Sequence, residues 1–315
     1  MITGKTNCVG ILGYPVGHSL SPVMHNAAFE KNQMDYVYIP LPTPSAELSV
    51  AVSALKAWNF RGANVTIPHK VAVMEYLDEI AEDARMIGAV NTITIRDGRA
   101  IGSNTDGIGF IASLRKAGAA PEGGKAVLLG AGGAARAVVW GLLQNGIENI
   151  TILVRNIEKG SAFAERFASH GDIKVYAFDD AEAKKALRTC TLLVNTTPLG
   201  MAPKLDAMPN VDWADVAEGA VVYDLIYTPL MTRFLREAQE HGHQVINGKD
   251  MLIEQGAESF FRWTGIEPHR PSMEEAFDSF WLWEWKLRTL WVQNLTRVLP
   301  WKWSTMRTWR QGKRI

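Results

Sequence analysis

The amino-acid sequence predicts an α/β protein of two domains, one of which carries a doubly wound, Rossmann-type parallel sheet. Strand-like and helix-like segments alternate along most of the chain, which is the pattern of α/β folds. A glycine-rich turn near the middle follows a short apolar run and precedes a helix, as in doubly wound sheets. The length of 315 residues also exceeds that of most single domains.

The first unit is predicted from short apolar strands that alternate with helices. Pro22 suits the first position of a helix, where its missing N–H would have no partner. Asp97-Gly98 is typical of a two-residue hairpin turn. Strands are expected at residues 9–13, 36–40, 62–67, 89–95 and 100–102, and helices at residues 22–31, 46–58 and 69–78.

The second unit is predicted to begin with a helix at residues 107–116. Its apolar runs are nearly continuous, as in strands buried on both faces of a parallel sheet. Strands are expected at residues 125–129, 150–154, 192–195, 220–225 and 245–247, with helices from the glycine-rich turn to residue 143 and at residues 158–169. A helix at residues 250–263 comes late in the chain, and we expect it to pack back on the first unit.

Composition and charge exclude several classes of protein. Hydrophobic residues make up 47% and charged residues 21%, as in ordinary globular proteins. The formal net charge of zero does not favour a nucleic-acid binder. No signal peptide and no membrane-spanning run is visible, and Cys8 and Cys190 form no metal-binding motif. We therefore expect a cytoplasmic protein without a metal site that binds neither nucleic acid nor membrane.

The segment 281–315 differs from the rest of the chain. It holds seven of the 11 tryptophans and eight Lys or Arg residues, but a single acidic residue, Glu284. Its apolar residues have loosely helical spacing, so an amphipathic helix is one interpretation. Basic residues beside tryptophans could also contact a membrane or a nucleic acid. A poorly ordered appendage, or an altered reading frame at the end of the gene, is the interpretation we favour.

The glycine-rich turn, Gly130-Ala-Gly-Gly-Ala-Ala, fits the G-x-G-x-x-G/A pattern of dinucleotide-binding sheets. Gly130 permits the tight turn, Gly132 lets the backbone approach a pyrophosphate, and Ala135 allows close packing of helix on strand. The helix that follows offers free N–H groups to the phosphates. Dense packing of small residues alone could explain the pattern, but the surrounding strands and helix favour a dinucleotide site.

The next strand ends at Val154-Arg155-Asn156, about 20 residues past the glycines, where NAD sites usually place an acidic residue. Arg155, with Lys159 one turn later, suits a 2′-phosphate instead, because a guanidinium forms paired hydrogen bonds with phosphate oxygens. The sequence thus favours NADP over NAD. A solvated surface arginine is the alternative.

Polar residues in the first unit stand close to predicted helix starts. In Ser19-Leu-Ser-Pro, Ser21 is expected at the N-cap, and two hydroxyls beside a helix N-terminus suit a carboxylate. In Asn64-Val-Thr-Ile-Pro-His-Lys, Pro68 is expected at the first helical position and Lys70 in the first turn. The N-terminus of a helix disfavours the charged form of a lysine. The lysine can then lose and regain its proton more easily, as a general acid and base must. Simple helix capping and an ordinary surface lysine are the alternatives.

Three further polar residues complete the candidate site. Asp106, in Asn104-Thr-Asp-Gly, could pair with Lys70 or only cap a helix. Asn91 and Gln255 carry amides that suit a polyol, although a strand-end turn and a helix surface would also explain them.

Seven motifs in order resemble those of shikimate dehydrogenases over roughly residues 7 to 278. They are Ser19-Leu-Ser-Pro, Asn64-Val-Thr-Ile-Pro-His-Lys70, Gly88-Ala-Val-Asn91-Thr, Asn104-Thr-Asp106-Gly, Gly130-Ala-Gly-Gly-Ala, Asn195-Thr-Thr-Pro-Leu-Gly-Met, and Asn247-Gly with Met251-Leu and Gln255-Gly. The chain departs from the family at Val154-Arg155-Asn156, where Asn-Arg-Thr is frequent, and beyond residue 280.

The resemblance implies NADPH-dependent reduction of 3-dehydroshikimate to shikimate, in the chorismate pathway to aromatic amino acids, by a monomer or homodimer. It implies Lys70 as the general acid and base, with Asp106 orienting it. Implied substrate-binding residues are Ser19, Ser21, Asn64, Thr66, Asn91, Asp106, Tyr227 and Gln255. Implied cofactor-binding residues are Gly130, Ala131, Gly132, Gly133, Ala134, Arg155, Asn156, Lys159, Leu225 and Gly248. The implied domains are residues 1–105 with 247–280 for substrate and 106–246 for NADP, followed by the atypical 281–315 segment.

Three other functions remain open from the sequence. A quinate/shikimate dehydrogenase using NAD shares these motifs, although the serine pair and the absence of an acid at residues 154–156 argue against it. A non-catalytic sensor of shikimate-type ligands would have no need of Lys70 or Asp106, and both are present. An interaction protein would work through the tryptophan-rich segment.

Overall fold

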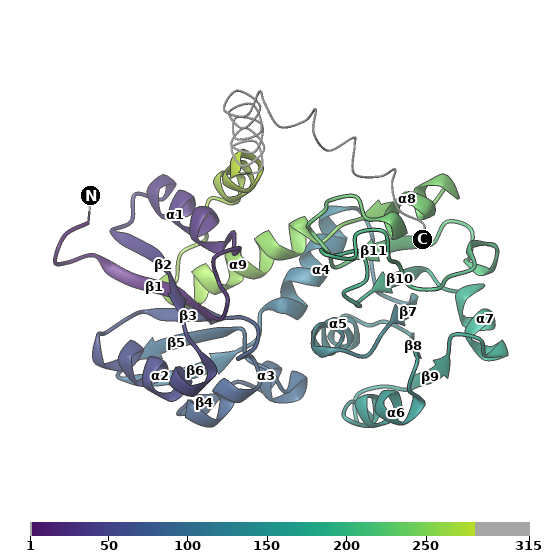
Figure 1. Cartoon of the computed structure of the whole chain (residues 1–315), viewed down its shortest axis with the longest axis horizontal. Helices are drawn as coiled ribbons and strands as arrows, with labels where there is room; N and C mark the ends of the chain where they lie inside the picture. Colours follow the sequence, from purple (N-terminus) through teal and green to yellow (C-terminus); the bar gives the residue numbers. More distant parts are fainter. Residues whose placement is uncertain (1, 281–315) are drawn as a thin grey trace, which may run out of the picture.

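The computed structural model describes residues 2–280 and contains two units, each built on a six-stranded sheet. Figure 1 shows the units side by side, with helices α4 (Asp106–Lys116) and α9 (Lys249–Thr264) crossing between them. Within the described residues, no helix is both long and apolar enough to cross a membrane. The tryptophan-rich segment lies outside the described residues.

The first sheet is mixed, with strand order β2-β1-β3-β5-β6-β4. Its strands are β1 (Asn7–Gly13), β2 (Tyr36–Pro42), β3 (Gly62–Val65), β4 (Glu79–Ile80), β5 (Thr92–Arg96) and β6 (Arg99–Ser103). β1 pairs in parallel with β2 and β3, whereas β5 runs antiparallel to β3 and β6. Asp97 and Gly98 both have positive φ, which confirms the predicted tight turn between β5 and β6.

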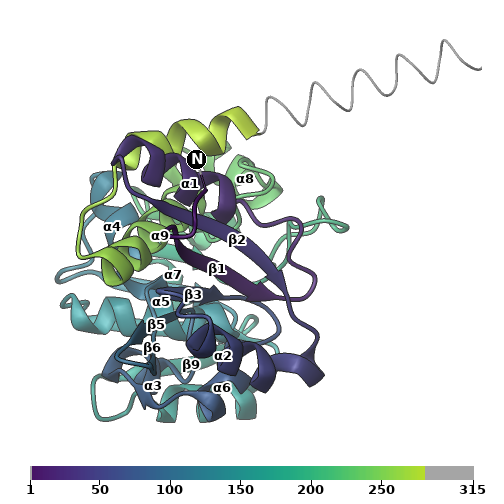
Figure 2. The same ribbon diagram turned by 90° about the vertical axis from the view of Figure 1, so that its left-hand side faces the viewer.

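Helices cover both faces of this sheet, as Figure 2 shows. On one face, α1 (Ser21–Lys31) and α9 bury an apolar cluster that includes Val9, Phe29 and Phe260. On the other face, α2 (Leu48–Ala57) packs against Leu12 and its neighbours. A further helical segment begins at residue 270 and adds Met273 and Phe277 to the α1 side. The expected return of the late helices to the first unit is therefore confirmed.

The second sheet is entirely parallel, with strand order β12-β11-β10-β7-β8-β9. Its strands are β7 (Lys125–Leu129), β8 (Asn149–Val154), β9 (Ile173–Ala177), β10 (Leu192–Asn195), β11 (Val221–Asp224) and β12 (Val245–Ile246). The order reverses between β7 and β10, which makes the sheet doubly wound, as predicted. Such sheets bind ligands beyond the carboxyl ends of the strands, at the reversal.

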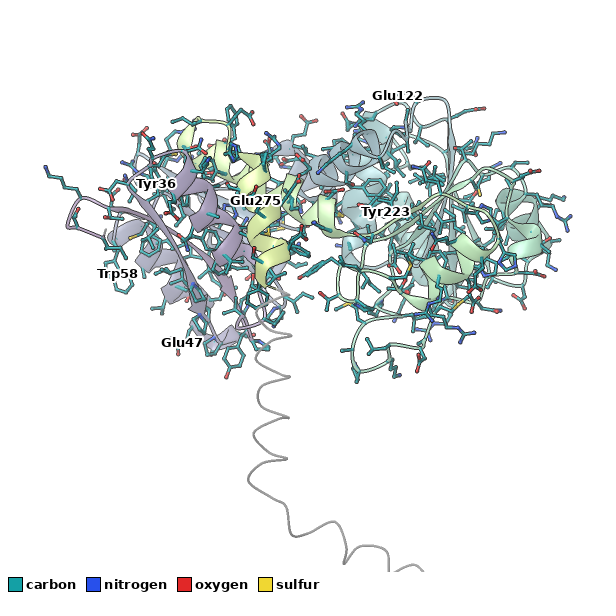
Figure 3. All side chains as sticks on the ribbon, turned by 90° about the horizontal axis from the view of Figure 1, so that it is seen from above. Tyr36, Glu47, Trp58, Glu122, Tyr223 and Glu275 are labelled. Carbon is teal, nitrogen blue, oxygen red and sulfur yellow. The ribbon has the colours of Figure 1, made fainter. Side chains whose placement is uncertain are left out.

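Helices also cover both faces of the second sheet. They are α5 (Gly133–Gln144), α6 (Ile157–Glu165), α7 (Ala181–Leu187) and α8 (Arg233–Glu240). One apolar cluster lies under α4, α5 and α6, and another under α7 and α8. Tyr223, labelled in Figure 3, is fully buried, and its hydroxyl lies 2.7 Å from the Ser113 hydroxyl of α4.

Two glycines allow α4 to lie close to its neighbouring helices. A Cβ atom on Gly107 would lie 2.8 Å from the carbonyl oxygen of Ala137 in α5. A Cβ on Gly109 would lie 2.6 Å from the backbone nitrogen of Gln255 in α9. α4 therefore joins the two units through backbone contacts that a larger residue would separate.

Some predicted elements differ from the observed ones. The helix expected at residues 69–78 is a 3₁₀ helix, Ala72–Tyr76, followed by β4 and a helix that was not predicted, α3 (Glu82–Ile87). Pro68 lies in a turn before it, and the β-branched Val71 and Val73 disfavour an α-helix. Strand β9 and helices α7 and α8 were also not predicted. Strand β9 is half exposed and lacks a continuous apolar run.

Candidate active site

The two acid–base candidates meet between the units. Lys70 donates from Nζ to Oδ2 of Asp106 at 2.6 Å, and the two side chains are 33% and 14% exposed. Lys70 lies in a turn before the 3₁₀ helix, so its expected place in the first turn of a helix was wrong. Asp106 is the first residue of α4, and the N-cap is Thr105, so simple capping does not explain Asp106. An ammonium has three donors, which leaves Lys70 able to reach a ligand.

Asn91 connects this pair to α9. Its Nδ2 donates to Oδ1 of Asp106 at 2.7 Å and lies 3.3 Å from Oε1 of Gln255. Its Oδ1 accepts from the backbone N–H of Thr105 at 2.8 Å. The structure therefore brings together Lys70, Asp106, Asn91 and Gln255 from four separate parts of the sequence.

The serine pair lies at the start of α1. The helix begins at Ser21, with Leu20 as N-cap, so the prediction that Ser21 is the N-cap was wrong. The Ser21 backbone N–H donates to the Ser19 hydroxyl at 3.3 Å, and Ser21 is buried. The Ser19 hydroxyl therefore accepts from the first N–H of α1, whereas the Ser21 side chain makes no capping hydrogen bond, so capping alone does not explain Ser21.

Asn64 and Thr66 follow different patterns. Asn64 is buried, and its amide is engaged within the protein by the hydroxyls of Tyr38 at 2.8 Å and Ser259 at 3.0 Å. Thr66 is half-buried at the end of β3, beside the turn that carries Lys70. Asn64 thus supports the site through buried hydrogen bonds, one of them to the backbone carbonyl of Asn91 at 3.2 Å, whereas Thr66 lies beside Lys70.

Tyr227 and Gly248 lie where the second unit meets the first. Tyr227 is half-buried, its ring packs edge-on against Phe277, and burial raises the pKa of its hydroxyl. A Cβ on Gly248 would lie 2.0 Å from the carbonyl oxygen of Leu225, so only glycine fits there. This close contact holds the segment after β11 against the start of α9.

The glycine-rich turn lies at the carboxyl end of β7, beside the reversal of strand order. Gly130 has a φ of 99°, a conformation that favours glycine. A Cβ on Gly132 or Gly133 would meet no protein atom within 4 Å, so the space in front of the turn is open to a phosphate. Ala131 and Ala134 lie in the same turn and at the start of α5. The turn therefore fits a dinucleotide.

The cationic residues after β8 lie at the adjacent strand end. Arg155, Asn156 and Lys159 are exposed, and the Asn156 side chain caps α6 by accepting from the Lys159 N–H at 2.8 Å. Among the described residues, neither Arg155 nor Lys159 has a carboxylate partner. Two unpaired cations beside the turn suit a 2′-phosphate.

Three buried hydroxyls around Asn91 were not predicted. The Thr92 hydroxyl lies 2.8 Å from that of Ser259 and donates to Asn91 Oδ1, and the Thr105 hydroxyl accepts from Asn91. Ser259 lies four positions after Gln255 and therefore on the same face of α9, which is the one signal that could have identified it. These hydroxyls fix the orientation of the Asn91 amide. The orientation decides that Nδ2, and not Oδ1, faces the carboxylate of Asp106.

Three family profiles match the chain in order. They are described as Shikimate dehydrogenase substrate binding domain, at residues 11–93, Shikimate / quinate 5-dehydrogenase, at residues 114–198, and Shikimate 5'-dehydrogenase C-terminal domain, at residues 248–276.

Individual proteins match over nearly their whole length. A shikimate dehydrogenase (NADP(+)) of Carboxydothermus hydrogenoformans is 46% identical over 275 residues, covering 87% of this chain and 98% of that protein. A crystal structure of a shikimate dehydrogenase with NADP+ has a TM-score of 0.82 and 43% identity, covering 89% of this chain and 97% of that one. The Listeria monocytogenes shikimate 5-dehydrogenase with shikimate and NAD has a TM-score of 0.84 and 34% identity, covering 88% and 98%. These similarities confirm the predicted fold and the predicted resemblance.

Proposed function

Because the chain belongs to the shikimate dehydrogenase family, we propose that it catalyses the reversible, NADPH-dependent reduction of 3-dehydroshikimate to shikimate. The observation that carries this proposal is the contact of Lys70 with Asp106 beside an open glycine-rich turn. Bound NADPH supplies a hydride to the carbonyl carbon of the substrate.

Lys70 is proposed as the general acid and base. Its ammonium donates a proton to the carbonyl oxygen as the C=O bond becomes CH–OH, and its amine takes the proton back in the reverse reaction. Asp106 accepts a hydrogen bond from Lys70 and so keeps the ammonium directed at one place. Asn91 holds the other oxygen of the same carboxylate, so the pair cannot rotate freely.

The remaining polar residues are proposed to bind the two ligands. Ser19 and Ser21 would hold the substrate carboxylate, because two hydroxyls are suited to donate to it. The ring hydroxyls would be bound by Thr66, Asn91, Asp106, Tyr227 and Gln255. Asn64 would support this site through its hydrogen bond to the backbone carbonyl of Asn91. The cofactor would be held by Gly130, Ala131, Gly132, Gly133, Ala134, Arg155, Asn156, Lys159, Leu225 and Gly248.

At the level of the whole protein, we propose that residues 1–105 with 247–280 form the substrate domain and residues 106–246 the NADP domain. We further propose that the enzyme works in the cytoplasm as a monomer or homodimer. The unpaired Arg155 and Lys159, with no acid at residues 154–156, support NADP over NAD.

The test is the rate of NADPH formation with shikimate, alongside quinate and NAD+. Lys70→Ala should lower kcat by about 10²–10⁴, the usual contribution of a general acid–base group. Lys56→Ala is the matched control, because Lys56 pairs with Asp78 in the same unit, away from the site.

Each outcome separates the alternatives. Faster turnover of quinate with NAD+ would identify the sister activity. Binding of shikimate without turnover of any substrate and cofactor pair would identify the protein as a ligand sensor. Equal rates in wild type and Lys70→Ala would show that Lys70 is not the general acid and base.

A further inference from the structure

Among the described residues, Asp224 is a buried carboxylate without a positively charged partner. It is the last residue of β11 and is fully buried. Its hydrogen-bond partners in the described part of the chain are neutral, and burial raises the pKa of its carboxyl to about 6. A buried, unpaired carboxylate is costly, so its presence calls for a reason other than packing.

The partners of Asp224 come from three different segments. Oδ1 accepts from Nδ2 of Asn195, at the end of β10, at 3.0 Å, and from the backbone N–H of Ile226 at 3.1 Å. Oδ2 accepts from the hydroxyl of Thr232 at 2.7 Å. One side chain thus ties together the exits of two neighbouring strands and the start of α8.

Each partner extends the connection further. Asn195 Oδ1 accepts from both the backbone N–H and the hydroxyl of Thr197, at 3.0 and 2.7 Å. Thr232 is the N-cap of α8 and accepts from the Leu235 N–H. Thr197 in turn lies against Gly130, where a Cβ would be 2.8 Å from its methyl carbon. The network therefore reaches the glycine-rich turn.

These segments belong to the second half of the doubly wound sheet. Such sheets consist of two mononucleotide-binding halves that meet at the reversal of strand order. The half with β8 carries the unpaired Arg155 and Lys159, which suit the adenosine 2′-phosphate. The half with β10, β11 and β12 is left for the nicotinamide nucleotide, and it leads through Tyr227 to the first unit.

We propose that Asp224 is a positioning residue that fixes the loops receiving the nicotinamide half of NADP. It is fully buried, so it acts through Asn195, Ile226 and Thr232 rather than by touching the ligand. This inference rests on the proposed function, because it assumes that NADP binds at the glycine-rich turn.

The second unit contains a matched control. Asp215 is also a buried aspartate, but it pairs with Arg188 at 2.6 Å and with Lys184 at 3.7 Å. It lies in the short 3₁₀ helix Trp213–Asp215, away from the carboxyl ends of β7, β10 and β11. If the role of Asp224 were merely structural, its replacement would have the same effect as a replacement of Asp215: lower stability with unchanged binding of ligands.

The experiment is calorimetric titration with NADP+ and with adenosine 2′,5′-bisphosphate, which lacks the nicotinamide half. Asp224→Ala should weaken NADP+ binding about tenfold or more, because it leaves buried donors unsatisfied where that half binds. Binding of the bisphosphate should change by less than about twofold. Asp215→Ala should lose stability and bind both ligands like wild type.

Conservative variants guard against failure to fold. Asp224→Asn should bind NADP+ within about threefold of wild type, because its oxygen still accepts from Asn195 and Ile226 and its amide can donate to Thr232. Thr232→Val removes one donor and should give a smaller, equally selective loss.

The outcomes are separable. Equal weakening of both ligands, or unchanged NADP+ binding in Asp224→Ala, would overturn the positioning role while leaving the proposed function intact. Failure of wild type to bind either ligand would overturn both.

Discussion

Lys70 and Asp106 lie 36 positions apart, yet their side-chain atoms are 2.6 Å from each other. Each residue alone had an ordinary explanation in the sequence, as a surface lysine and as a helix cap. The structure removes the second explanation because Thr105 occupies the N-cap. Neither residue alone indicates a functional site, but their contact in the folded structure does.

His25 gives a prediction at the same scale. It is fully buried, its ring stacks on Tyr38 with centroids 4.5 Å apart, and neither ring nitrogen has a hydrogen-bond partner among the described residues. Burial lowers its pKa from 6.5 to about 3. Between these two pH values the unfolded chain binds a proton at His25 that the folded protein does not, so the contribution of His25 to stability falls as the pH falls through this range.

The measurement is the free energy of unfolding of wild type and His25→Phe at pH 7 and pH 4.5. Wild type should lose more stability on acidification than the variant, by up to about 1.4 kcal/mol per pH unit. The exposed His18, changed to Gln, serves as control and should retain the wild-type dependence. An identical loss in wild type and His25→Phe would show that His25 does not remain neutral.

At the scale of elements, the close packing of α4 against α9 requires a residue without a side chain at Gly109. Gly109→Ala places a methyl group 2.6 Å from the Gln255 nitrogen and 2.8 Å from the Met251 carbonyl oxygen, so the helices must separate. Alanine favours a helix by about 1 kcal/mol, but overpacking costs about 1–3 kcal/mol, so a net loss of stability is expected. The KM for shikimate should also rise, because Gln255 moves with α9.

Urea unfolding and steady-state kinetics test this expectation together. Ile108→Ala changes an exposed residue of the same helix and should alter neither quantity appreciably. A Gly109→Ala protein as stable as wild type would mean that α4 and α9 can move apart freely.

Most elements could be predicted from the sequence, and the failure at β9 has a physical cause. The parallel strands β7, β8, β10 and β11 are buried on both faces and carry continuous apolar runs, so they were recognised. Strand β9 is at the edge of its sheet and half exposed, and it lacks that signal. Likewise, Asp224 and Ser259 gain their partners only through folding: Asn195 lies 29 positions from Asp224, and Asn64 lies 195 from Ser259.

At the scale of the whole molecule, a further contact joins the two units, besides the crossing of α4 and α9 and the packing around Tyr227 and Gly248. Arg166, just after α6, donates to the carbonyl oxygens of Met86 and Arg85 at 2.7 and 3.2 Å. These carbonyls lie in the last turn of α3, a few residues before Asn91 and strand β5. Helix C-terminal carbonyls attract a cation, so the contact holds the first unit against the second.

Arg166→Ala should therefore loosen the two units more than it destabilises either one. Hydrogen exchange at residues 84–90 should accelerate about five- to tenfold, corresponding to the loss of about 1 kcal/mol from an exposed, charge-assisted contact. Arg233→Ala, which breaks an ion pair with Glu237 inside α8, should leave exchange at residues 84–90 unchanged. Unchanged exchange in Arg166→Ala would show that this contact does not hold the units together.

The return of α9 to the first unit also has a consequence for biosynthesis. The core under α1 needs Ile253, Ala257 and Phe260, which a ribosome adds only after the whole second unit. At about 5–20 residues per second, α1 and β1 must wait on the order of ten seconds or more for these partners. The second unit is one uninterrupted stretch of chain and can fold during that interval, so nascent chains should acquire the second, parallel sheet before the first, mixed one.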